Sequence, residues 1–234
     1  MSKYLKLAVM ISGGGRTLAN LINWWDQGRL AAKVELVVSS RPRAKGLEIA
    51  AEAGIRTAVV DSANHRISAR EGEEICDWMG MSKEIDRHLL NDDLDLVCMA
   101  GFLCRYLIPE PLRGRVINIH PALIPMFCGQ GMFGRRIHEA VVAAGVRVTG
   151  CTVHFVDNSY DHGPIIMQRC CPVFSGDLPE EVAARVFAEE CLAYPGVINL
   201  IAEGRVHTTP GLPVYVDGDH SLERFGQDDR WPGA

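Results

Sequence analysis

The segment Leu5-Lys-Leu-Ala-Val-Met-Ile11, followed by Ser12-Gly-Gly-Gly-Arg-Thr17, carries the strongest indication of the fold class. Its first seven residues form an apolar run of the length of a buried strand. Three glycines interrupt the chain, and residues 18–27 then have a helical pattern that Gly28 would end. A strand, a glycine turn and a helix in this order form the opening unit of a parallel α/β sheet.

The alternation of strands and helices continues along the chain. We expect further strands at 34–39, 57–60, 95–100, 116–120, 149–156, 165–173 and 214–216, and helices at 44–53, 68–91, 135–144 and 179–203. This order predicts an α/β, Rossmann-like fold, with a mostly parallel twisted sheet flanked by helices. The two strands after residue 148 are joined by a loop alone, so we expect an antiparallel C-terminal part.

Length and composition indicate one globular domain over residues 1–234. The chain is 47% hydrophobic and 23% charged, and we find no linker, repeat or low-complexity block. The polar tail over about 218–234 is expected to be disordered. The net charge of −5 gives no indication of a nucleic-acid or membrane surface.

The sequence indicates a cytoplasmic protein. No run approaches the roughly 18 apolar residues of a membrane span. The first residues continue directly into a strand pattern, so we do not expect a signal peptide. The eight cysteines lack the spacing of a disulfide scaffold and are expected to be reduced.

The glycine loop is a candidate phosphate site, because backbone N–H groups would be free at the start of a helix. Gly13-Gly14-Gly15-Arg16-Thr17 lacks both the third glycine of a dinucleotide loop and the Gly-Lys-Ser/Thr of a nucleoside-triphosphate loop. Arg41 and Arg43 follow the second strand and would suit the 2′-phosphate of NADP. A tight turn without a ligand remains an alternative.

A second candidate site lies at the end of the strand 116–120. Asn118 and His120 are two residues apart, so their side chains share one face of the strand, and Pro121 ends it. Asp161 lies in the loop before His162-Gly-Pro164 and is a candidate partner for the imidazole, or a simple turn residue.

Other histidines and known site patterns contribute less. His138 and His154 fall inside helix and strand patterns and are expected to be structural. The sequence contains no serine nucleophile elbow and no credible zinc-binding spacing, so we expect no metal.

Four motifs in one order resemble those of the folate-dependent formyltransferases. They are Ile11-Ser-Gly-Gly-Gly15, Ala100-Gly-Phe102, Asn118-Ile-His-Pro121 and Asp161-His-Gly-Pro164. The resemblance covers residues 5 to 207. It implies transfer of the formyl group of 10-formyltetrahydrofolate, as a co-substrate, to the amine of 5-phosphoribosylglycinamide, a step of purine biosynthesis. It further implies a phosphate-binding half (1–100) and a folate-binding, catalytic half (101–210).

The resemblance also implies roles for individual residues. Asn118 and His120 would stabilise the developing oxyanion, and Asp161 would assist proton transfer through His120. Glu190 would meet the glycinamide end. The substrate phosphate would be held by Gly13, Gly15, Arg16 and Thr17. The folate side would be lined by Arg70, Leu103, Cys104, Arg105, Asn118, Asp157 and Tyr160.

Two loops depart from the usual pattern of the family. Ala122-Leu-Ile-Pro125 stands in place of Ser-Leu-Leu-Pro and is followed by an unusual loop, Met126–Gly134. The first loop has Gly-Arg-Thr where the family has Gly-Ser-Asn. Both changes concern the amine substrate more than the formyl chemistry.

Alternatives to this function remain open. A formyltetrahydrofolate deformylase, a formyltransferase acting on another amine and an NADP-binding module are the competing readings. We expect neither the N-terminal regulatory domain of the deformylases nor the C-terminal domain of the methionyl-tRNA relatives. The expected partners are small-molecule substrates, without nucleic acid or membrane, in a monomer or a homodimer.

Overall fold

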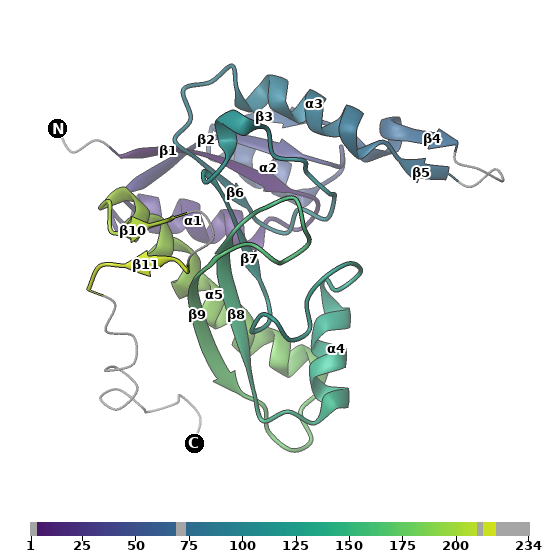
Figure 1. Cartoon of the computed structure of the whole chain (residues 1–234), viewed down its shortest axis with the longest axis vertical. Coiled ribbons are helices and arrows are strands. Elements are labelled where there is room, and N and C mark those ends of the chain that lie inside the picture. The colour runs from purple at the N-terminus through teal and green to yellow at the C-terminus, as the bar shows by residue number, and fades with distance from the viewer. Residues whose placement is uncertain (1–3, 69–73, 210–212, 219–234) are drawn as a thin grey trace.

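A mixed β-sheet forms the centre of the molecule (Figure 1). The computed structural model describes residues 4–68, 74–209 and 213–218. Within them, seven strands form a sheet in the order β3-β2-β1-β6-β7-β8-β9. These strands are β1 (Leu5–Ile11), β2 (Ala32–Ser39), β3 (Arg56–Val59), β6 (Leu96–Met99), β7 (Val116–His120), β8 (Val148–Phe155) and β9 (Ile165–Pro172). The neighbouring strands β3, β2, β1, β6 and β7 are parallel to one another. Strand β8 pairs antiparallel with both β7 and β9. This arrangement confirms the expected fold class.

Helices cover both faces of the sheet. On one face pack α1 (Arg16–Asp26), α2 (Lys45–Glu52) and α5 (Pro179–Ala202), with α4 (Arg135–Ala144) against α5; on the other packs α3 (Trp78–Leu89). Alternate residues of β1 enter the two cores, with Val9 in the first and Met10 in the second. This double burial explains why β1 is continuously apolar.

The expected helix over residues 68–91 is wrong in its first part. Two short strands, β4 (Arg66–Ser68) and β5 (Glu74–Cys76), form a hairpin that projects beyond the start of α3 (Figure 1). The helix begins only at Trp78, because the Asp77 carboxylate accepts a hydrogen bond from the Gly80 amide at 2.9 Å and caps it. The predicted helix was therefore too long at its start, because it ran across the capping residue Asp77.

Short elements complete the chain. They are the 3₁₀ turns η1 (Ser62–His65) and η3 (Glu110–Leu112), and the strands β10 (Val206–His207) and β11 (Tyr215–Val216), which pair with each other. The expected disordered tail from about residue 218 falls almost wholly outside the described residues. All eight cysteines are free. In the part of the chain that the structure describes, no helix has the length and apolar character needed to cross a membrane.

The carboxyl ends of β1, β6 and β7 lie at one edge of the sheet, as parallel neighbours require. The Ser12 amide after β1 donates to the carbonyl of Gly101 after β6 at 3.1 Å. From α5, the buried Tyr194 hydroxyl reaches the carbonyl oxygens of Met99 and Ile117 at 2.9 and 3.1 Å. Tyr194 therefore joins α5 to two neighbouring strands next to this edge.

Replacing Tyr194 by Phe is expected to destabilise the fold by about 1–3 kcal/mol, because the carbonyl groups of Met99 and Ile117 lose the one O–H donor that they share. In a domain of this size the melting temperature would fall by about 2–4 °C for each kcal/mol. Thermal unfolding followed by circular dichroism measures the change. The matched control is Tyr215→Phe, at a residue that is 64% exposed. Equal melting temperatures for the Tyr194 variant and the wild type would contradict this assignment.

Candidate active site

One cavity of about 720 Å³ opens at this edge of the sheet. It brings together residues from the glycine loop, the ends of β6 and β7, the loop after β8, and α5. The expected site residues that line it are Gly13, Gly15, Arg16, Thr17, Leu103, Cys104, Arg105, Asn118, His120, Asp157, Tyr160, Asp161 and Glu190. Arg70 lies outside the described residues.

The glycine loop approaches α2 so closely that side chains would not fit. Gly15 is the N-cap of α1 and has a left-handed backbone, with φ of 72°. A Cβ atom at Gly15 would lie 2.5 Å from the Cα of Gly46. No side chain caps α1, and its first turn contains no acidic residue. The first turn of α1 therefore offers uncapped N–H groups to the cavity, the arrangement that binds anions.

Asn118 is oriented by His154, which lies directly opposite it on β8. The Nδ1–H of His154 donates to the carbonyl of Phe155 at 2.8 Å, and burial lowers the pKa of His154. The ring is therefore neutral, and its Nε2 accepts a hydrogen bond from the Asn118 amide at 3.2 Å. This contact fixes the amide plane and leaves the second N–H of Asn118 available.

His120 and Asp161 face each other at the centre of the site. His120 Nδ1 lies 3.6 Å from an Asp161 carboxylate oxygen, and both side chains are largely buried. On the other side of the ring, Nε2 donates to the carbonyl of Phe127 at 2.9 Å. Each ring nitrogen thus faces an acceptor, so a doubly protonated ring can donate on both sides.

The loop after β8 folds back to bring Asp161 to this position. Asp161 has a φ of 50°, in the left-handed region that Asp tolerates better than most residues. A Cβ atom at Gly163 would lie 1.9 Å from the carbonyl oxygen of Phe155, so only glycine fits there. The Asp-His-Gly-Pro motif is therefore a backbone requirement as well as the source of a carboxylate.

The loop Met126–Gly134 contacts both members of the His120–Asp161 pair. The Phe127 carbonyl accepts from His120, and the Gly129 amide donates to Asp161 at 2.9 Å. The segment before this loop is held by the buried Thr152 hydroxyl, which donates to the Ala122 carbonyl at 2.7 Å. The loop that departs from the family pattern is thus joined to the centre of the site.

Glu190 faces the cavity from α5, one turn after Phe187. Burial raises the pKa of its carboxyl group to about 7, and the positive charge of Arg16 opposes this shift. Near neutral pH this carboxyl group therefore exchanges between its neutral and charged forms.

The folate-side candidates lie on two loops that hold each other. The Arg105 guanidinium donates to the carbonyl of Asn158 at 2.9 Å and lies 5.8 Å from the centre of the Tyr160 ring. The Leu103 amide donates to the Ser12 hydroxyl at 2.8 Å, which ties this region to the glycine loop. The phosphate-side loop and the folate-side loops are therefore connected by hydrogen bonds.

Sequence reasoning did not single out Phe187, and it took His138 and His154 as structural, yet all three line this cavity. Arg41, named as a candidate for the 2′-phosphate of NADP, lines it too. His138 is buried, its Nδ1 has no hydrogen-bond partner among the described residues, and burial lowers its pKa. His154 was expected to be structural, although it contacts Asn118. The signal that could have identified it was its position, since a residue opposite Asn118 on an antiparallel neighbour must face the same cavity.

Comparisons with known proteins point to one family. The model of the formyl transferase family matches residues 5–198. The chain is 34% identical to phosphoribosylglycinamide formyltransferase of Haemophilus influenzae, over 91% of this chain and 94% of that protein. It is 39% identical to the trifunctional purine biosynthetic protein adenosine-3 of Gallus gallus, over 86% of this chain and 19% of that protein.

Solved structures give the same result. The fold matches the crystal structure of glycinamide ribonucleotide transformylase 1 from Symbiobacterium toebii with a TM-score of 0.77 and 34% identity, covering 92% and 95% of the two chains. The chain spans 19%, 62% and 66% of the length of three curated relatives that it matches. On the family model and the Haemophilus influenzae relative, this chain belongs to the formyl transferase family.

Proposed function

We propose that this chain transfers the formyl group of 10-formyltetrahydrofolate to the amine of 5-phosphoribosylglycinamide. The observation that carries this proposal is the meeting of Asn118, His120 and Asp161 with the uncapped first turn of α1 in one cavity. A candidate acyl-transfer centre and a candidate anion site thus share one cavity, which supports a phosphorylated amine as the substrate.

Asn118 and His120 act on the oxygen of the formyl group. As the amine nitrogen bonds to the formyl carbon, the electron pair of the C=O bond moves to oxygen. The free N–H of Asn118 and a donor N–H of His120 stabilise that negative charge. His120 donates by giving up its contact with the Phe127 carbonyl or by turning toward the substrate.

Asp161 assists the proton transfers of the reaction through His120. The C–N bond to the folate breaks as its nitrogen takes up a proton, and the attacking amine loses one. A carboxylate 3.6 Å from His120 stabilises the charged imidazole that exchanges these protons. Glu190, which lines the same cavity from α5, is proposed to accept a hydrogen bond from the amine.

The remaining assignments follow the two halves of the cavity. We propose that Gly13, Gly15, Arg16 and Thr17 hold the phosphate. The folate is proposed to contact Leu103, Cys104, Arg105, Asn118, Asp157 and Tyr160. We further propose a single domain over residues 1–234 that acts in the cytoplasm on small molecules, as a monomer or a homodimer.

The proposed reaction is tested by following 10-formyltetrahydrofolate with and without 5-phosphoribosylglycinamide. We expect loss of the formyl-folate only when the amine is present, with one formylated amine formed for each formyl group lost. Equal loss without the amine would instead identify a deformylase. Tight NADP binding without folate binding would assign Arg41 and Arg43 to a dinucleotide site.

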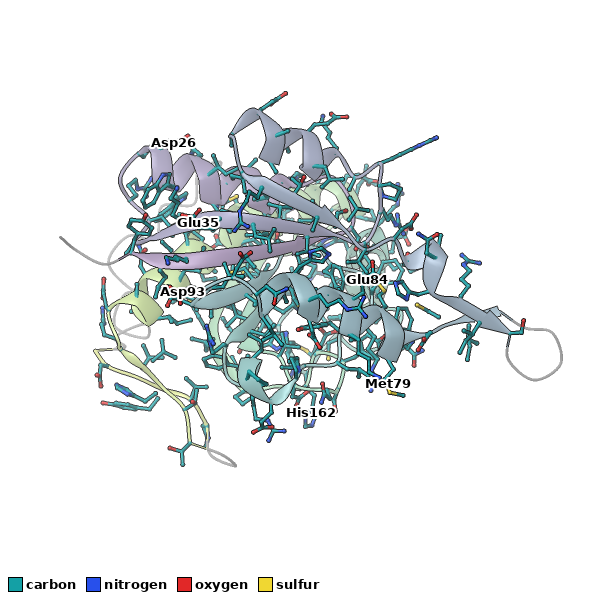
Figure 2. All side chains as sticks on the ribbon, turned by 90° about the horizontal axis from the view of Figure 1, so that it is seen from above. Asp26, Glu35, Met79, Glu84, Asp93 and His162 are labelled. Atoms are coloured by element: carbon teal, nitrogen blue, oxygen red, sulfur yellow. The ribbon has the colours of Figure 1, made fainter. Side chains whose placement is uncertain are left out.

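His120→Ala and Asp161→Asn should each lower kcat about 10²-fold or more, because each removes a member of the acid–base pair. Asn is chosen at position 161 because it tolerates the left-handed backbone there. Steady-state kinetics with saturating substrates measures the effect. Matched controls are His207→Ala and Asp26→Asn; His207 is exposed on β10, and Asp26 lies at the periphery at the end of α1 (Figure 2). Turnover like that of the wild type in either site variant would remove it from the catalytic assignment.

Glu190→Gln should stabilise the protein at alkaline pH. The pKa of Glu190 is raised from 4.5 to about 7, so the folded state binds more protons than the unfolded state between these values. Stability therefore falls as pH rises through this window, and the penalty is complete above pH 7. Gln carries no such penalty.

The difference in melting temperature between Glu190→Gln and the wild type measures this effect. We expect it to be small at about pH 5 and to reach several °C at about pH 8.5, since each unit of pKa shift is worth about 1.4 kcal/mol and each kcal/mol shifts the melting temperature of a domain of this size by about 2–4 °C. Because the variant and the wild type are measured at each pH, the contributions of all other titrating groups to the melting temperature cancel in the difference. Glu48→Gln, at an exposed position of α2, is the control. A difference that does not change with pH would mean that Glu190 titrates normally.

A further inference from the structure

The Arg16 guanidinium stacks on the ring of Phe187 inside the cavity. Its carbon atom lies 3.6 Å from the ring centre, close enough for a cation–π contact. Arg16 is the first residue of α1, and Phe187 lies near the middle of α5, so the contact joins two helices that are distant in sequence. Both residues line the cavity, and Phe187 is half-buried while Arg16 is exposed.

Stacking leaves the hydrogen-bonding groups of Arg16 free. A guanidinium holds its five N–H groups in one plane, and an aromatic ring occupies the face of that plane, not its edge. Among the described residues, Arg16 makes no ion pair. The positive charge of Arg16 acts on Glu190 without a direct contact, and the carboxyl group of Glu190 is only partly charged near neutral pH. The N–H edge of Arg16 is therefore not committed to a carboxylate.

The position of this edge fits a phosphate. Arg16 follows Gly15 directly, so its side chain starts at the uncapped first turn of α1. Backbone N–H groups and a planar guanidinium together match the oxygens of a phosphate better than either alone. A freely rotating exposed arginine would lose side-chain entropy on binding, whereas a stacked one has already lost much of it.

We propose that Phe187 is a positioning residue, which holds Arg16 by stacking so that its N–H edge faces the phosphate bound at the first turn of α1. Phe187 thereby sets the affinity for the phosphorylated amine without taking part in formyl transfer. This inference rests on the proposed function, because it assigns the phosphate to the same substrate.

Phe187→Leu, which keeps an apolar side chain but removes the ring, tests the proposal in the full chain. The KM for 5-phosphoribosylglycinamide should rise about 3- to 30-fold, the range that a cation–π contact spans. We expect kcat and the KM for 10-formyltetrahydrofolate to stay within about twofold, since neither depends on the phosphate. Phe187→Tyr, which keeps the ring, should restore the wild-type KM.

Two further comparisons separate positioning from a general structural role. In an Arg16→Gln background, Phe187→Leu should add no further loss, because the stacked partner is gone. The matched control is Phe174→Leu, since Phe174 lies under Arg185 at 4.9 Å in a similar pair but does not line the cavity. An unchanged KM in Phe187→Leu, or the same loss with and without Arg16, would overturn the proposal.

Binding of ribose 5-phosphate, measured by calorimetry, keeps this test independent of turnover. We expect weaker binding by Phe187→Leu and Arg16→Gln than by the wild type and by Phe174→Leu. If the four proteins bind ribose 5-phosphate in this order but the wild type does not formylate the amine, the proposed function fails and the role of Phe187 stands. Equal binding by all four proteins, or none, would overturn the role of Phe187.

Discussion

The candidate site depends on the reversal of strand direction between β7 and β8. Because β8 runs antiparallel to β7, His154 lies opposite Asn118 and can fix its amide. The chain also leaves β8 without a crossover helix, in a loop short enough to fold back over the sheet. That return brings Asp161 to His120 and requires Gly163 beside the Phe155 carbonyl. In a fully parallel sheet the strand beside β7 would be followed by a crossover connection, and this returning loop would be absent.

Local patterns were sufficient for most of the fold. Residues 116–120 and 135–144 were predicted with the bounds that the structure has, because their apolar periodicity and their flanking Pro121 and Gly145 agree. The paired strands β4 and β5 were missed for the opposite reason. Their residues suit a helix by composition, whereas Asp77 forms a capping contact with Gly80 that starts the helix later. Whether such a capping contact forms depends on the surrounding packing, which the periodicity of the sequence does not describe.

The candidate site divides in a similar way. Residues that belong to a motif, such as Asn118 and Asp161, could be named from the sequence. His154 and Phe187 belong to no such motif, since each acts through a partner more than 30 positions away. His154 becomes identifiable only once the register between β7 and β8 is known, and Phe187 only once the two helices are placed. The partly buried Glu190 is intermediate: the resemblance indicated its position, but its raised pKa depends on burial within the folded chain.

The loop Met126–Gly134 holds the His120–Asp161 pair through a carbonyl group and an amide group of its backbone. Backbone groups are present whatever side chains a loop carries. The two contacts therefore depend on the path of this loop and on its glycines, such as Gly129 with φ of 98°, and not on its side chains. A loop of different sequence can keep both backbone contacts, so a departure from the family pattern here does not by itself indicate a different chemistry at His120 and Asp161.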